Sequence, residues 1–126
     1  MDDVDAKKSS IYKVAIASTD GENVNQHYGR SDRFYVYLVD DNEGYDFSEL
    51  RNVEAICMDG EHSDLKMVER LSNFGDCRYV VASKIGTGAS ASLRSVGIIG
   101  MELPGTVDDA ILAVWKYNRI QGLFNK

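Results

Sequence analysis

The run Tyr79-Val80-Val81-Ala82-Ser83 is short, apolar and rich in β-branched residues, and the glycine-containing turn Ile85-Gly86-Thr87-Gly88 follows it closely. Such a run is typical of a buried strand. The turn leads into a short helix rich in Ala and Ser that closes with Leu93, and Val96 to Met101 supplies another strand. Strand, helix and strand in this order predict two parallel strands joined by a covering helix.

Helices are predicted on both sides of this unit. Before it, Ser63 is placed to cap a helix in which Leu65, Val68 and Leu71 recur on one face, and Gly75 is placed to end that helix. After it, a last helix is predicted, with Pro104-Gly105 before it and Thr106 and Asp109 as a capping-box pair at its start. Its periodic residues at helical spacing are Ile111, Val114, Trp115 and Asn118, and Gly122 is predicted to end it.

The first half of the chain predicts strands only. Lys13-Val14-Ala15-Ile16-Ala17-Ser18 ends at the turn Asp20-Gly21, after which Glu22 to Asn25 predicts a return strand and a hairpin. Phe34 to Val39 is aromatic and β-branched, as in a central strand covered on both faces. Tyr45 to Val53 alternates more loosely and predicts its antiparallel outer neighbour.

These elements predict an α/β protein with a ribonuclease H-like fold. Its mixed five-stranded sheet has an antiparallel first half, and helices pack on it. The polar, aperiodic start predicts a disordered tail over residues 1–11 and one domain over residues 12–126.

Composition excludes several classes of function. A net charge of -6 over 126 residues, with a pI near 4.8, opposes binding to nucleic acid or to an anionic membrane. No apolar run approaches the roughly 20 residues that span a bilayer, and the acidic start is unlike a signal peptide, so we expect a cytoplasmic protein. The two cysteines are expected to be thiols, and with His27 and His62 they are too dispersed along the chain to indicate a structural zinc site.

A family resemblance rests on two blocks of residues. The first is Asp20-Gly21, then Val24-Asn25-Gln26-His27-Tyr28-Gly29-Arg30-Ser31, then Arg33-Phe34. The second is Cys57 with Glu61-His62 and Asp76-Cys77, followed by Ile85-Gly86, Leu93 and Gly97-Ile98. Together they resemble the dinitrogenase iron-molybdenum cofactor biosynthesis family, which includes NifX, NafY and the carboxy-terminal part of NifB.

The resemblance implies a ribonuclease H-like fold and a role in metallocofactor assembly for nitrogen fixation. It implies a carrier or chaperone, not an enzyme, that transiently binds an iron-sulfur cluster such as the iron-molybdenum cofactor or its precursor. The partners that it implies are nitrogenase assembly proteins or other cluster-assembly proteins.

His27 is the leading candidate ligand, because imidazole binds iron and molybdenum and Gly29 leaves room for a bulky inorganic group. The alternative is that His27 only braces its loop. Arg30 and Arg33 are candidates for offsetting the negative charge of a cluster, or else solvent-facing partners of acidic side chains.

The other candidate ligands are one cysteine and one histidine in the middle of the chain. Cys57 and His62 lie five positions apart, near the start of the first helix, and are possible second contacts. His27 and Cys57 are the two residues assigned to the metal itself. Cys77 precedes a buried strand and is interpreted as a small core residue.

Other functions find less support in the sequence. The turn at Gly86-Thr87-Gly88 could offer backbone N–H groups to an anion, or could simply be tight, and it lacks a P-loop lysine. A two-metal nuclease would need acidic residues on the first strand, which has none. A thiol enzyme would need a third group to orient Cys57 and His62. The main alternative is a regulatory or protein-interaction module of the same fold that binds no cluster.

Overall fold

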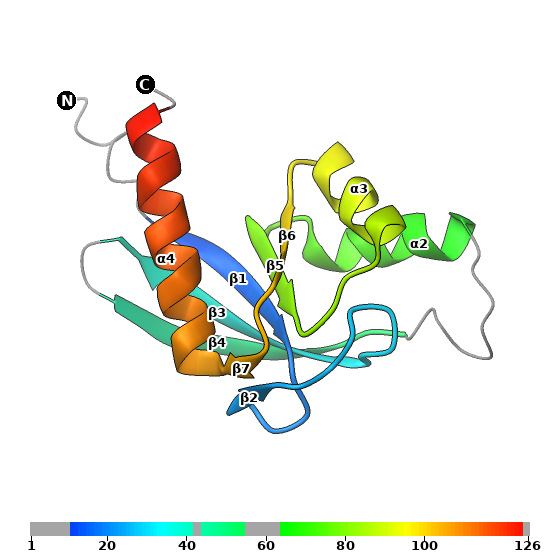
Figure 1. Cartoon of the computed structure of the whole chain (residues 1–126). Helices are drawn as coiled ribbons and strands as arrows, with labels where there is room; N and C mark the ends of the chain where they lie inside the picture. The colour runs from blue at the N-terminus through cyan, green and yellow to red at the C-terminus, as the bar shows by residue number, and fades with distance from the viewer. Residues whose placement is uncertain (1–10, 42–43, 55–63, 125–126) are drawn as a thin grey trace.

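In the computed structural model, which describes residues 11–41, 44–54 and 64–124, the chain forms a five-stranded mixed sheet in the order β4-β3-β1-β5-β6 (Figure 1). β3 is antiparallel to both of its neighbours, β1 and β4, whereas β5 runs parallel to β1 and to β6. These strands are β1 (Ile11–Ala17), β3 (Arg33–Asp40), β4 (Gly44–Asn52), β5 (Tyr79–Ala82) and β6 (Ile99–Glu102).

Helices cover both faces of the sheet. The long helix α4 (Val107–Phe124) lies over one face, while α2 (Asp64–Leu71), the 3-10 turn η2 (Ser72–Phe74) and α3 (Thr87–Ser95) lie on the other (Figure 1). A separate two-stranded ladder joins β2 (Asn23–Val24) to β7 (Gly105–Thr106).

The central strand β1 explains why both layers are needed. Val14 and Ile16 are buried in the core beneath α4, whereas Ala15 and Ala17 are buried in the core beneath α2 and α3. Alternate residues of a strand point to opposite faces, so a strand that is apolar on both sides must be covered twice. The result is three layers, with one core on each side of the sheet.

Most of the predicted elements are confirmed. The four strands predicted near residues 13–18, 34–39, 45–53 and 79–83 correspond to β1, β3, β4 and β5, and the Ala- and Ser-rich helix corresponds to α3. β6 begins at Ile99, three residues later than predicted, because Val96 and Gly97 form the turn that ends α3. The Thr106 cap is also present, since its hydroxyl accepts a hydrogen bond from the Asp109 N–H at 3.1 Å.

The predicted hairpin after β1 is wrong. The Ser18 hydroxyl accepts the N–H groups of Asp20 and Gly21, and the Asp20 carboxylate accepts those of Glu22 and Asn23. These side chains turn the backbone away from β1, so residues 23–24 pair with β7 instead.

Two further expectations are corrected by the packing. β3 was expected to be a central strand covered on both faces, but the centre of the sheet is β1. The layer of α2 and α3 does not extend over all of β3, because the side chain of Leu38 is 38% exposed. Gly122 does not stop the last helix, which continues to Phe124. A helical glycine costs only about 1 kcal/mol relative to alanine, less than the packing of the preceding turns provides.

The predicted cap Ser63 and residues 1–10 of the predicted tail lie outside the described residues, and Ile11 opens β1.

Gly21 offers a test of the turn that follows β1. Its φ is +77°, and a Cβ atom there would lie 2.8 Å from Cε2 of Tyr35. We expect Gly21→Ala to lower the free energy of unfolding in urea by about 2–4 kcal/mol, from backbone strain plus overpacking. Gly97→Ala is the matched control, because Gly97 has φ +84° with open space around it and should show the backbone cost alone. Equal losses in the two variants would mean that Tyr35 does not confine the turn.

Candidate functional site

The carboxyl ends of the parallel strands β1, β5 and β6 lie at one edge of the sheet, which we call the carboxyl edge. β1 and β5 are adjacent and parallel, and the connection from β1 to β3 passes over the carboxyl end of β5, because β2 pairs with β7, which follows β6, before the chain returns to β3. Ligands of open α/β sheets bind outside the carboxyl ends of the strands. The loop of residues 25–32, which connects β2 to β3, lies at this position (Figure 1).

The backbone of His27 is fixed to the end of β5. The Ser83 N–H donates to the carbonyl of Gln26, and the Tyr28 N–H donates to the carbonyl of Lys84, each at 2.9 Å. These two hydrogen bonds place His27 in a parallel bridge with Lys84, which is two residues beyond the last residue of β5. The loop therefore extends the pairing of the sheet past its carboxyl edge.

The side chain of His27 is exposed, although its backbone is fixed. Its carbonyl accepts hydrogen bonds from the N–H groups of Arg30 at 3.1 Å and Ser31 at 3.0 Å, which close a tight turn. The next residue, Tyr28, is buried, and its ring centroid lies 6.1 Å from that of Phe34. A buried anchor beside an exposed imidazole leaves the ring accessible on a backbone that has little freedom to move.

Two of the predicted cationic residues belong to the same region. Arg30 lies in the turn and is exposed. Arg33 opens β3, is also exposed, and donates from Nη1 to the carbonyl of Thr19 at 2.9 Å, so it links the loop after β1 to the loop of His27. Lys84, exposed and bridged to His27, adds a third cation that the sequence did not single out.

Arg70 is a residue of this region that sequence reasoning missed. The predicted inner face of its helix contained Val68, but Val68 is 63% exposed whereas Arg70 is only 3% exposed. The Arg70 guanidinium donates to backbone carbonyls of the His27 loop and lies over the rings of Tyr28 and Phe34. A charged residue in an amphipathic helix is ordinarily assigned to the solvent face, so no sequence signal marked it.

The predicted second contacts, Cys57 and His62, lie outside the described residues. Cys77, in contrast, is buried in the core beneath α2 and α3, as predicted. It precedes β5 and so lies at the end of that strand opposite to the carboxyl edge. Burial raises the pKa of the Cys77 thiol to about 12, which leaves it protonated and makes it a poor ligand near neutral pH.

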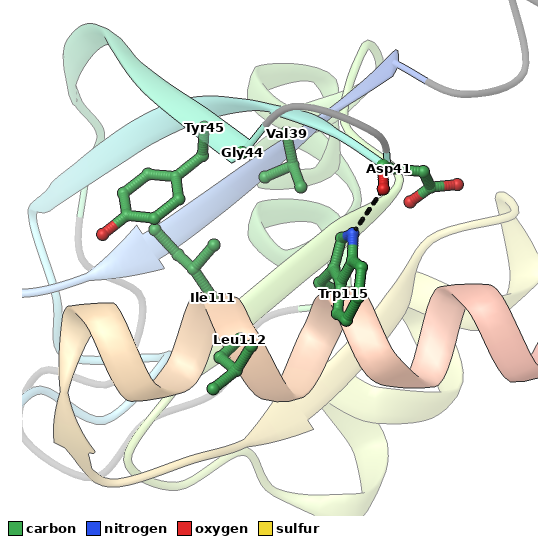
Figure 2. Close-up of a pocket in the computed structure, with 7 residues that line it drawn as sticks. All are labelled: Val39, Asp41, Gly44, Tyr45, Ile111, Leu112 and Trp115. Atoms are coloured by element: carbon green, nitrogen blue, oxygen red, sulfur yellow. Dashed lines mark hydrogen bonds between the residues drawn. The ribbon is translucent and has the colours of Figure 1, made fainter.

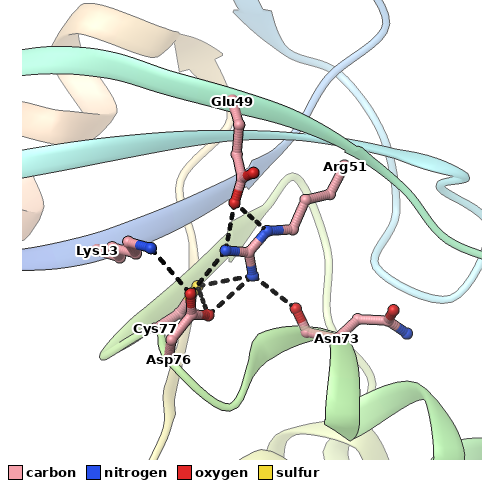
Figure 3. A network of polar contacts seen from close by, with 6 residues as sticks. All are labelled: Lys13, Glu49, Arg51, Asn73, Asp76 and Cys77. Carbon is pink, nitrogen blue, oxygen red and sulfur yellow. Dashed lines mark hydrogen bonds and ion pairs between the residues drawn. The ribbon is translucent and has the colours of Figure 1, made fainter.

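Figure 3 shows the ionic network beside Cys77. Arg51 donates to both carboxylate oxygens of Asp76, at 2.7 and 2.8 Å, and Lys13 donates to the same carboxylate at 3.0 Å. Arg51 also donates to the carbonyl of Asn73 at 2.7 Å, so the network ties β4 and β1 to η2 and to the segment between η2 and β5. Its role is structural, and it is separate from the His27 loop.

A hollow of about 240 Å³ lies between α4 and the adjoining ends of β3 and β4 (Figure 2). It is lined mainly by apolar side chains, and the Trp115 indole donates to the carbonyl of Asp41 at 2.9 Å across it. β3 ends at the edge opposite to His27, so this hollow is not part of the His27 region. The lining residues are Val39, Asp41, Gly44, Tyr45, Ile111, Leu112 and Trp115.

Two searches of the described residues bear on the class of site. Within residues 11–41, 44–54 and 64–124, no group of three or more His, Cys, Asp or Glu side chains is placed to hold a metal ion. Over the same residues, no helix is long and apolar enough to cross a membrane.

Comparison with known proteins defines the class. Residues 10–117 match the family model of the dinitrogenase iron-molybdenum cofactor domain, and the chain therefore belongs to that family. It resembles the cofactor biosynthesis protein NifB of Chlorobaculum tepidum, with 28% identity over 110 residues that cover 87% of this chain and 25% of NifB. It also resembles the NifX protein of Klebsiella pneumoniae, with 30% identity over 92 residues, or 73% of this chain and 56% of NifX.

Solved structures agree with this relationship. The crystal structure of the protein PH0822 superposes with a TM-score of 0.61 at 27% identity, covering 82% of this chain and 88% of that one. A Thermotoga protein solved by NMR shares the fold with a TM-score of 0.53 at 21% identity, covering 86% of this chain and 90% of that one. The chain spans only about a quarter to a half of the NifB and NifX relatives, but most of these two structures.

The ionic network predicts how stability depends on pH. Hydrogen bonds from Arg51 hold the pKa of the Asp76 carboxyl below its ordinary value of 3.8. The ionised form therefore stabilises the fold above about pH 4, and this contribution is lost as the pH falls through the folded-state pKa. We expect Asp76→Asn to lower the free energy of unfolding at pH 7 by at most about 1 kcal/mol, because the carboxylate is half-exposed and screened.

The same variant should lose less stability than the parent between pH 4 and pH 2, as followed by urea unfolding. Asp46→Asn is the control, since Asp46 is exposed on β4 and makes no ion pair with another residue that the structure describes. A parent and an Asp76→Asn variant with parallel pH profiles would show that the network has no electrostatic role.

Proposed function

We propose that this protein transiently carries an iron-sulfur cofactor precursor, with His27 as the leading ligand. The observation that carries the proposal is the exposed imidazole on a fixed loop at the carboxyl edge, outside the adjacent ends of β1 and β5. Membership of the dinitrogenase iron-molybdenum cofactor domain family supports a cargo of this chemical class. The proposed role is one of binding and transfer, with no chemical step performed by the protein.

The charges around His27 support an anionic cargo. Three exposed cations, Arg30, Arg33 and Lys84, lie in or beside the loop, although the whole chain carries a net charge of -6. One exposed carboxylate, Asp32, lies in the same loop, while Asp20 accepts backbone N–H groups of its turn and Glu102 accepts the N–H of Ile85 at 2.7 Å. Local cations can attract an anion that the distant acidic surface would repel.

The small number of ligands suits a carrier. A cluster that is held permanently is usually bound by several thiolates, whereas one imidazole leaves most coordination positions for another protein. We propose that Cys57 or His62 supplies a second contact during loading, and that the partners are nitrogenase assembly or other cluster-assembly proteins. Exchange between such partners requires that the cargo can leave as well as bind.

We also propose that the fold is of the ribonuclease H-like class. The strand order β4-β3-β1-β5-β6, antiparallel on one side of β1 and parallel on the other, supports a ribonuclease H-like classification. Under this assignment residues 12–126 form the functional unit.

A second candidate function is a protein-interaction module that binds no cluster. The observation in its favour is the outer strand β4, on which Tyr45, Phe47 and Leu50 are 41%, 55% and 43% exposed. Exposed apolar residues grouped on an edge strand are a feature of surfaces that contact other proteins.

His27→Ala tests the carrier directly. Under anaerobic conditions, the parent and the variant are titrated with isolated iron-molybdenum cofactor and, separately, with a synthetic [4Fe–4S] thiolate cluster. We expect the variant to bind the cofactor and the synthetic cluster at least about tenfold more weakly, because it lacks the imidazole that would coordinate a metal of the cluster.

Arg94→Ala is the control for this experiment. Arg94 is exposed in the last turn of α3, a helix that starts near the carboxyl edge and runs back across the sheet. The Arg94→Ala substitution should leave the affinity for both clusters unchanged. Equal affinity in the parent and in His27→Ala would remove His27 as the ligand, and no binding by the parent would favour the interaction module.

A further inference from the structure

We infer that Arg70 is a positioning residue that holds the His27 loop in its binding conformation. This inference rests on the proposed function, because it concerns the same site, but it adds a residue that contacts no cargo. It starts from an unusual placement: Arg70 is a charged residue of α2 that is 3% exposed, and its guanidinium donates hydrogen bonds to backbone carbonyls of other segments.

Arg70 contacts the His27 loop at its turn. Its Nη2 donates to the carbonyl of Tyr28 and, at 3.0 Å, to the carbonyl of Ser31. Both carbonyls belong to the turn that the His27 carbonyl closes. The loop is thus held by β5 through Gln26 and Tyr28 and by α2 through Tyr28 and Ser31.

The same guanidinium reaches a third segment. Its Nη1 donates to the carbonyl of Glu54, which follows the end of β4. A single side chain therefore joins α2, the His27 loop and the chain that leaves β4. In sequence, the stretch between Glu54 and Arg70 contains Cys57 and His62.

Arginine is suited to this position in a way that lysine is not. Its planar guanidinium presents donors on two nitrogens at once, whereas a lysine ammonium is a single point of attachment. The guanidinium carbon also lies 4.7 Å from the ring centroid of Tyr28 and 5.3 Å from that of Phe34, which fixes the plane by cation–π contact. Substitution by lysine would keep the charge and lose both the fork and the stacking.

Removal of the guanidinium would leave the carbonyls of Tyr28 and Ser31 without these donors in a buried place. The loop would then have to shift so that the carbonyls reach water or other donors. A shift at Tyr28 moves His27, its neighbour in the chain. Residues that orient a metal ligand without touching the metal typically change affinity by about 10- to 100-fold when they are replaced.

The experiment compares Arg70→Lys and Arg70→Gln with the parent, and uses Arg94→Lys as the control at an exposed arginine. The first readout, amide hydrogen exchange by NMR, needs no cargo. We expect exchange of the Tyr28 and Ser31 amides to rise at least about tenfold in the Arg70 variants, while amides of β1 and β5 stay protected.

The second readout is affinity for isolated iron-molybdenum cofactor, measured in the parent background and in the His27→Ala background. In the parent background we expect Arg70→Lys to weaken binding by about 10- to 100-fold. In the His27→Ala background the same substitution should change affinity by less than about twofold, because a residue that acts through His27 has nothing left to position.

Each outcome decides the inference. Unchanged loop exchange in Arg70→Lys would overturn it, and so would an equal loss of affinity in both backgrounds, because Arg70 would then act elsewhere. If Arg70→Lys and Arg70→Gln both fail to fold, Arg70 serves general stability and the inference is wrong. A parent that does not bind the cofactor refutes the proposed function alone, since the exchange measurement still decides whether Arg70 holds the loop.

Discussion

The pairing of β1 on its two sides determines where the rest of the molecule can go. β1 is hydrogen-bonded antiparallel to β3 on one side and parallel to β5 on the other, so the carboxyl ends of β1 and β5 lie side by side. The connection from β1 to β3 passes outside these two ends, and its His27 loop is held there by hydrogen bonds to Ser83 and Lys84. The same pairing buries β1 on both faces, which requires a helical layer on each side and so fixes the places of α2, α3 and α4.

The sequence predicted the elements whose signals are local. The β-branched run at residues 79–83 and the capping threonine at Thr106 each act within a few residues, and both agree with the structure. The failures involve long-range partners. Residues 23–24 were expected to return against β1, but their partner is β7, more than 80 positions further along the chain. No local pattern contains that information, because a two-residue strand has too little periodicity to specify its neighbour.

The candidate site, like the fold, could be predicted from the sequence only in part. His27, Arg30 and Arg33 were identified from the sequence, and the structure places all three in or beside one loop at the carboxyl edge. Cys77 was correctly assigned to the core. Arg70 could not be found, because its function in the fold depends on carbonyls that come from residues about 40 positions away and become neighbours only after folding. Lys84 was overlooked for the same reason, since only the bridge between the loop and β5 brings it next to His27.

The contrast between a fixed backbone and an exposed ring bears on how cargo would be held and released. If the loop were mobile, binding would have to order it, and that entropic cost would weaken an interaction already limited to few ligands. Because hydrogen bonds from β5 and α2 order the backbone in advance, a single imidazole can contribute most of its intrinsic affinity. Because the ring remains exposed, a receiving protein can approach the cargo without first opening the fold. Under the proposed function, one preorganised and exposed ligand would combine moderate affinity with rapid exchange, whereas enclosure by many ligands would give tight binding with slow release.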